Sequence, residues 1–151
     1  DEWTTYKGVK LSGDTVTALC GGHNGIETRM PVTYAKMVST GRISLERFAE
    51  ITSPNAAKIL GMYPQKGAIA VGSDADIVLF DPDANKKLTL DDLHADSDYS
   101  IWEGFQTTGY PVTTILRGKV IVENGQLLGS ASDGRWLNRK VSPSVLARPA
   151  C

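Results

Sequence analysis

Residues 53–78 read SPNAAKILGMYPQKGAIAVGSDADIV, and the hydrophobic pattern changes its period within this stretch. Up to Gly61 the apolar residues recur at helical spacing, and the pair Ser53-Pro54 is typical of a helix start. After Gly61 the apolar residues are β-branched and stand between Gly, Asp and Pro, which indicates short strands. The sequence therefore predicts an α+β fold in which helices are followed by a β meander.

The chain before Gly61 predicts a long loop over residues 1–29 and then three helices. The first helix spans about 31–40, the second spans about 45–52 with Ser44 as its N-cap, and the third spans about 54–60. The second helix has an apolar face that we expect to point inward. This face consists of Leu45, Phe48, Ala49 and Thr52.

The chain after Gly61 predicts strands joined by tight turns. Residues 67–72 and 75–82 are expected to form two short strands, with Asp81-Pro82 closing the second. A weak strand at 87–90 and a helical turn at 91–94 follow. The clearest part is a three-stranded meander, whose strands are 112–117, 120–123 and 126–128, with turns at Gly118-Lys119 and Asn124-Gly125.

The last part of the chain, residues 129–151, is rich in Ser, Arg and Pro and is expected to be a surface tail. The segment Asp133-Gly134-Arg135-Trp136 is its expected anchor.

Composition excludes several classes of function. The 151 residues carry 16 Lys and Arg against 17 Asp and Glu, a net charge of -1, with no block of like charges. This balance argues against nucleic acid or an anionic membrane as partner. No apolar run approaches the roughly 20 residues of a membrane span. Two cysteines, Cys20 and Cys151, fit a reducing compartment and predict a cytoplasmic protein, and a first residue of Asp1 suggests a start inside a longer chain.

Local motifs for catalysis are missing. The chain has two histidines, His23 and His94, and no His-x-His, His-Glu-x-x-His or Cys-x-x-Cys spacing that announces a metal site. Cys20 lies three residues from His23, a spacing that fits a packed thiol better than a nucleophile. The Gly-rich run 21–25 could present backbone groups to an amide-containing ligand, or could simply form a turn before a helix.

Several blocks of the sequence resemble the dihydropyrimidinase and D-hydantoinase family, which are cyclic amidohydrolases of the amidohydrolase superfamily. In order, these blocks are residues 22–31, 53–67, 72–78, 98–104 and 111–120. The block Gly72-Ser73-Asp74-Ala75-Asp76-Ile77-Val78 is shared by the wider superfamily, whereas Gly25-Ile26-Glu27-Thr28-Arg29 and the block at 98–104 narrow the resemblance to cyclic amidases.

The resemblance covers only the last third of a family member. It implies a parent fold of a (β/α)8 TIM barrel with a small β-sandwich built from both chain ends. Residues 1–61 would be the end of the barrel domain, 62–128 the C-terminal part of the β-sandwich, and 129–151 a surface tail.

The resemblance also implies an activity, namely hydrolysis of a dihydropyrimidine or a 5-substituted hydantoin to an N-carbamoyl amino acid. A binuclear zinc centre would serve this reaction, with most ligands upstream of this chain. Asp1 would be the last metal ligand and general base, although Glu2-Trp3 replaces the usual His-Cys and an arbitrary fragment start is the alternative. Backbone at Gly21, with Gly22 and His23 beside it, would hold the cyclic ureide ring. The parent would be a homo-oligomer, dimer or tetramer, and this chain alone would be inactive.

Two hypotheses from other classes stay open. One is a non-catalytic relative of the family that serves assembly, and the other is a stand-alone β-sandwich interaction module. Within the enzyme hypothesis, allantoin or dihydroorotate are further possible substrates. A His-x-His pair and a mid-barrel Lys in the upstream reading frame would favour the enzyme.

Overall fold

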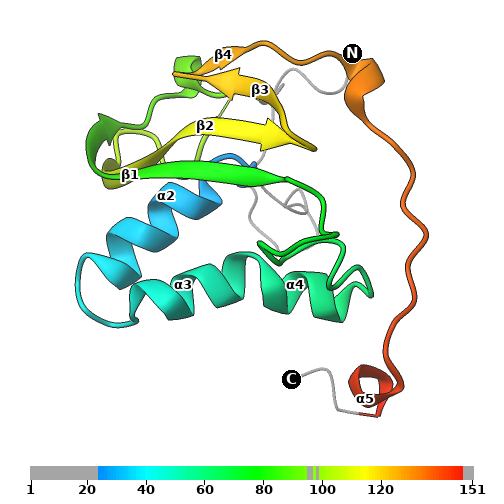
Figure 1. Cartoon of the computed structure of the whole chain (residues 1–151). Coiled ribbons are helices and arrows are strands. Elements are labelled where there is room, and N and C mark those ends of the chain that lie inside the picture. The colour runs from blue at the N-terminus through cyan, green and yellow to red at the C-terminus, as the bar shows by residue number, and fades with distance from the viewer. Residues whose placement is uncertain (1–23, 95–96, 98, 148–151) are drawn as a thin grey trace, which may run out of the picture.

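The computed structural model describes residues 24–94, 97 and 99–147. In this part of the chain an antiparallel sheet lies over a layer of helices, and a long tail leaves the sheet and ends in a short helix (Figure 1). Helices precede strands, so the predicted α+β class is confirmed. None of the helices in the described ranges has the length and apolar character needed to cross a bilayer.

The helical layer confirms the three predicted helices with small shifts at their ends. The first helix has an α-helical half and a π-helical half. The segments of the layer are α2 (Arg29–Thr33), η2 (Tyr34–Val38), α3 (Leu45–Thr52) and α4 (Pro54–Ile59). Ser44 caps α3, because its Oγ accepts a hydrogen bond from the backbone N–H of Arg47 at 3.2 Å. Gly41 follows the first helix with φ +72°, a conformation in which Gly avoids the strain of a side chain.

The sheet contains the predicted meander and one further strand at its edge. Its strands, in spatial order, are β1 (Ile77–Lys87), β2 (Gln106–Leu116), β3 (Lys119–Glu123) and β4 (Gln126–Leu127). Each strand pairs antiparallel with the next, as in the partners Val78 and Thr114. Three short helices complete the described elements: η3 (Leu90–Asp92), η4 (Ala131–Asp133) and α5 (Pro143–Leu146). The helical turn expected near 91–94 corresponds to η3.

The two hairpin turns follow from residues with positive φ. Asn124 and Gly125 have φ 49° and 80°, which confirms the predicted Asn-Gly turn. The other turn is centred on Arg117 and Gly118, with φ 47° and 82°. It lies one residue earlier than the expected Gly118-Lys119 pair.

The strand expected at 75–82 is present as the first part of β1, but its predicted end and two other strand predictions were wrong. Residues 67–72 form turns and bends, since no described strand lies beside them to receive their hydrogen bonds. β1 continues past Asp81-Pro82, because it is an edge strand whose pairing skips from Asp81 to Asn85, and Pro is tolerated at such an irregularity. Of the expected strand at 87–90, only Lys87 belongs to a strand.

The core lies between the helices and the sheet. Its centre is an aromatic cluster in which the ring centroid of Tyr34 is 5.7 Å from that of Phe48 and 4.7 Å from that of Phe80. Gly109 has φ +84°, and an ideal Cβ there would lie 2.4 Å from the Tyr34 ring, so Gly allows this ring to reach the sheet. Few apolar side chains are fully covered. The buried hydrophobic residues in the described ranges are Val32, Phe48, Ala57 and Leu88.

The tail is anchored by charge. The Lys119 Nζ is 2.8 Å from Asp133 Oδ1, the Arg117 guanidinium donates to the Asp133 carbonyl, and Arg135 contacts Asp74 at 2.9 Å. Trp136 is 89% exposed. The predicted anchor at 133–136 is therefore confirmed for Asp133 and Arg135 and wrong for Trp136.

Candidate functional site

The residues predicted to act on substrate and metal, Asp1, Gly21, Gly22 and His23, lie outside the described residues. The described chain begins at Asn24, directly after that loop. Its first residues line a cleft of about 300 Å³. The lining consists of Asn24, Gly25, Ile26, Glu27, Thr28, Leu93 and His94. We take this cleft as the candidate site, since it continues the predicted substrate loop.

The wall of the cleft leads directly into α2. Residues 26–28 form a turn, and the Thr28 carbonyl accepts the hydrogen bond from the backbone N–H of Val32 at 3.0 Å. Thr28 is 2% exposed, and its hydroxyl points back to the Gly25 carbonyl at 3.4 Å. A buried Thr at this position fixes where the loop ends and the helix begins. The segment 24–28 therefore has a defined position relative to the start of α2.

Glu27 and His94 join two distant parts of the sequence across the cleft. The backbone N–H of His94 donates to Glu27 Oε2 at 2.9 Å, and the imidazole Nδ1 lies 2.9 Å from Glu27 Oε1. Both oxygens of the Glu27 carboxylate therefore contact the same residue, His94. The side chain of Glu27 is 37% exposed and that of His94 is 64% exposed, so the pair lies at the mouth of the cleft.

Asn24 makes a second link to the same region. Its Nδ2 donates to the Tyr99 carbonyl at 2.7 Å, across 75 positions of sequence. Together with the Glu27–His94 pair, this bond holds the segment that follows Gly21–His23 against the loop that follows β1. Asn24 and Glu27, which follow the predicted substrate loop, are therefore both held by long-range polar contacts.

A group of polar and charged side chains interacts electrostatically with Glu27 of the cleft through Tyr110. The Lys86 ammonium stands 5.0 Å from the Tyr110 ring centroid and 3.2 Å from Asp92 Oδ1. The Thr89 hydroxyl donates to Asp92 Oδ2 at 2.7 Å, and this bond, with Lys86, lowers the pKa of Asp92. Burial raises the pKa of the Tyr110 phenol, Lys86 opposes the shift, and the carboxylates of Glu27 and Asp92 add to it. Tyr110 is therefore neutral near pH 7.

The described residues do not fit a metal centre. Nowhere in residues 24–94, 97 and 99–147 do three or more His, Cys, Asp or Glu side chains gather closely enough to hold an ion. The carboxylate of Glu27 is already bonded to His94, and that of Asp92 to Lys86 and Thr89. The cleft offers a ligand backbone groups and an apolar wall. These groups are suited to positioning a ligand rather than to cleaving one of its bonds.

Sequence reasoning missed the partners of this site. In the sequence, His94 stands out only as a histidine with no neighbour at metal-ligand spacing, and Glu27 has no predicted role. No local signal could have paired them, since 67 positions separate the two residues.

The family of this chain follows from its similarity to known proteins. A model described as the amidohydrolase family matches residues 4–121. The chain belongs to the amidohydrolase family. Among its relatives, a D-hydantoinase from Ralstonia pickettii is 46% identical over 136 residues, which is 89% of this chain and 30% of the relative. A D-phenylhydantoinase from Escherichia coli O1:K1 is 46% identical over 132 residues, which is 87% of this chain and 29% of the relative.

Solved structures agree with this assignment. The crystal structure of dihydropyrimidinase from Brevibacillus agri NCHU1002 superposes with a TM-score of 0.84 at 41% identity, covering 96% of this amidohydrolase chain and 31% of that one. A structure of D-hydantoinase gives a TM-score of 0.83 at 45% identity. The resemblance to dihydropyrimidinases and D-hydantoinases is thereby confirmed. The chain spans about 30% of the length of the relatives it matches.

Proposed function

We propose that this amidohydrolase chain is part of an enzyme that opens the ring of dihydropyrimidines or 5-substituted hydantoins, giving N-carbamoyl amino acids, and that it is inactive by itself. One observation carries the proposal. The chain matches D-hydantoinases at 46% identity over 30% of their length, and its described residues hold no group of metal ligands. The missing catalytic groups would then belong to the remaining portion of the parent chain.

The site residues have separate roles in this proposal. Asp1 is the metal ligand and general base from this chain, and Gly21, Gly22 and His23 hold the cyclic ureide through backbone. The contacts of Asn24 and Glu27 with Tyr99 and His94 support this arrangement, because they fix the exit of the substrate loop. A binuclear zinc centre, ligated mainly outside this chain, would supply a nucleophilic water near neutral pH.

The same proposal extends to the domain architecture, the oligomeric state and the cellular location of the parent protein. Residues 1–61 would complete a TIM barrel, residues 62–128 would form part of a composite β-sandwich, and residues 129–151 would be a surface tail. The side chains of Trp136 and Leu146 are 89% and 73% exposed, which would allow the tail to contact a neighbouring subunit of a dimer or tetramer. The two cysteines support a cytoplasmic location.

Two assays test the proposed activity. The purified 151-residue chain should turn over neither dihydrouracil nor a hydantoin. A chimera, in which this chain replaces the matched 30% of Ralstonia pickettii D-hydantoinase, should hydrolyse a hydantoin and lose activity with a chelator. Chelator-sensitive turnover by the 151-residue chain alone would contradict the proposed inactivity.

Variants of the chimera test the site residues. Asp1→Asn should lower kcat by at least about 100-fold, as expected for loss of a general base. Gly21→Val should raise KM more than it lowers kcat, because it obstructs backbone contact with the ring. A folded, metal-loaded chimera that hydrolyses no cyclic amide would favour the non-catalytic assembly protein instead.

A further inference from the structure

The connection between β1 and β2 reaches from the sheet to the candidate cleft. We name this connection, residues 88–105, the β1–β2 loop. The Tyr99 carbonyl in this loop accepts the hydrogen bond of Asn24, and His94 contacts the carboxylate of Glu27. The β half of the chain therefore contacts the segment that directly follows the predicted substrate loop.

The base of the β1–β2 loop is closed by hydrogen bonds within the loop. The backbone N–H of Leu88 donates to the Phe105 carbonyl at 2.9 Å, and that of Gly104 donates to the Leu88 carbonyl at 2.8 Å. The side chain of Leu88 is buried. The Glu103 carboxylate accepts the backbone N–H of Leu90 at 2.8 Å. The loop therefore leaves the sheet from a fixed base and can hold another segment in place.

The part of the loop that carries His94 is fixed as well. The short helix η3 ends two residues before His94. Its Asp92 carboxylate lies 3.2 Å from the Lys86 ammonium of β1, and it also accepts the Thr89 hydroxyl at 2.7 Å. An ion pair therefore ties this part of the loop to the neighbouring strand, and His94 stands on a supported turn.

The segment 24–28 is supported at two places. The buried Thr28 joins it to α2 at one end. The contacts of Asn24 and Glu27 hold the preceding stretch against the β1–β2 loop. Gly21 is three residues from Asn24, so at most about 11 Å of chain separate them. A displacement of Asn24 is therefore passed on to the predicted substrate loop with few bonds to absorb it.

Glu27 makes two bonds to the β1–β2 loop. Its two oxygens contact the backbone N–H and the imidazole Nδ1 of His94, each at 2.9 Å. A carboxylate only accepts hydrogen bonds, so Nδ1 carries the proton in this contact. Hydrogen bonds to a charged acceptor are stronger than bonds between neutral groups. Two of them on one residue also fix the direction of the carboxylate.

From these observations we infer that the β1–β2 loop positions the predicted substrate loop and that Glu27 is the positioning residue through which it acts. The β half of the chain would then set how tightly the cyclic substrate is held. The inference rests on the proposed function for the contact of Gly21–His23 with the ring. Contacts with parts of a substrate that do not react are made alike in the ground state and the transition state, so weakening them raises KM more than it lowers kcat.

Steady-state kinetics of the chimera test this role. Glu27→Ala should raise KM for a hydantoin about tenfold and lower kcat less than about threefold, because it removes both bonds to His94. His94→Ala should raise KM less, since the backbone N–H at position 94 remains. Glu27→Gln should bring KM back to within about twofold of the parent chimera. Its amide can accept the backbone N–H and donate to the other imidazole tautomer.

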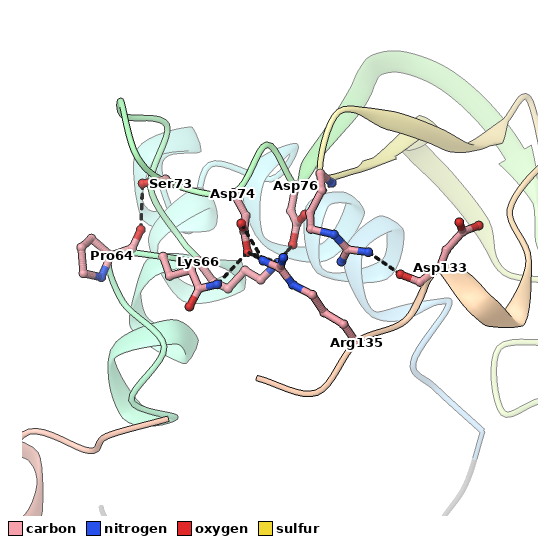
Figure 2. A network of polar contacts seen from close by, with 9 residues as sticks. Pro64, Lys66, Ser73, Asp74, Asp76, Asp133 and Arg135 are labelled. Atoms are coloured by element: carbon pink, nitrogen blue, oxygen red, sulfur yellow. Dashed lines mark hydrogen bonds and ion pairs between the residues drawn. The ribbon is translucent and has the colours of Figure 1, made fainter. Parts of the chain in front are cut away.

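Asp74→Asn is the matched control, because Asp74 is another carboxylate with long-range partners. Arg135 donates to both of its oxygens at 2.9 Å, and the Lys66 ammonium lies 2.9 Å from Oδ2 (Figure 2). Within the described residues, the lining of the candidate cleft contains none of these three. The control should lower the melting temperature of the chimera, as Glu27→Ala does, and leave KM within about twofold of the parent. A purely structural role of Glu27 predicts an unchanged KM for both variants.

Nuclear magnetic resonance of the 151-residue chain gives a readout that needs no activity. In Glu27→Ala the backbone order parameters of residues 25–28 should fall toward the flexible range below about 0.6, because the segment loses its hold on the β1–β2 loop. The order parameters of α3 should stay unchanged. In Asp74→Asn neither set should change.

The outcomes separate the inference from the proposed function. A chimera that binds a hydantoin without hydrolysing it, with a Kd raised by Glu27→Ala and not by Asp74→Asn, contradicts the function and supports the inference. A KM or Kd that both variants change alike, or that Glu27→Gln fails to restore, overturns the inference. Unchanged order parameters at residues 25–28 in Glu27→Ala also overturn it, whether or not the chimera is active.

Discussion

The carboxylate of Glu27 binds both the backbone N–H and the imidazole Nδ1 of His94, each at 2.9 Å, although 67 positions separate the two residues. The pair connects the segment before α2 with the segment after η3. It therefore ties the helical half of the chain to the β half at the mouth of the candidate cleft.

Removing this carboxylate should cost more than removing the imidazole. Glu27→Ala loses both contacts and should lower the free energy of unfolding by about 1 kcal/mol, whereas His94→Ala keeps the backbone N–H and should lose about half as much. Urea denaturation of the 151-residue chain measures both. Equal losses would show that the backbone contact contributes nothing.

Two serines, Ser44 and Ser53, occupy the N-cap positions of α3 and α4 and can be compared directly. Ser44 Oγ accepts the Arg47 N–H, whereas Ser53 precedes α4 with no side-chain cap bond. Ser44→Ala should therefore destabilise the chain by about 1 kcal/mol. Ser53→Ala should stay within about 0.5 kcal/mol. Thermal unfolding followed by circular dichroism compares them, and a Ser53→Ala loss as large as that of Ser44→Ala would contradict the assignment of the cap.

Two glycines with the same φ separate backbone strain from crowding. Gly41 and Gly61 have φ +72° and +71°, but an ideal Cβ on Gly61 would lie 2.6 Å from the backbone of Lys140, whereas nothing lies within 4 Å of one on Gly41. Gly41→Ala should cost about 1 kcal/mol for the left-handed conformation. Gly61→Ala should cost more and should also release the tail, because the Lys140 N–H bonds the Gly61 carbonyl at 3.0 Å.

Hydrogen exchange measures this release. In Gly61→Ala the amide of Lys140 should exchange faster than in the parent chain, while in Gly41→Ala it should be unchanged. Unchanged protection in both variants would mean that the tail does not depend on close approach at Gly61.

The ion pairs of Asp74 predict a pH dependence of stability. The pKa of Asp74 is about 2 in the folded chain, held down chiefly by Lys66, against an ordinary value of 3.8. A carboxyl with a depressed pKa stabilises the fold above its ordinary value, and this contribution disappears as the pH falls from about 3.8 to about 2. Asp74→Asn should therefore flatten the fall in stability over this window.

Urea midpoints between pH 2 and pH 6 test this prediction. The control is Asp83→Asn, an exposed carboxyl. If Asp74→Asn keeps the full acid dependence of the parent chain, the ion pairs with Lys66 and Arg135 do not couple to folding.

Much of the local structure was predictable from short-range chemistry. The Ser44 cap, the Asn124-Gly125 turn and the helix end at Gly41 all depend on residues within a few positions of one another. The strand prediction at 67–72 failed for the opposite reason. A β-branched run becomes a strand only when another strand lies beside it, and the ion pairs of Lys66 and Asp74 hold this run in a loop.

The amino-acid sequence alone thus determined the helices, the hairpin turns, the α+β order and the resemblance to cyclic amidohydrolases, because caps, turns and family motifs are properties of neighbouring residues. Only the tertiary structure decided that Glu27 meets His94, that Arg135 meets Asp74, and that the apolar face of α3 opens on a groove. Those contacts join residues tens of positions apart, and their distances depend on how the whole chain packs.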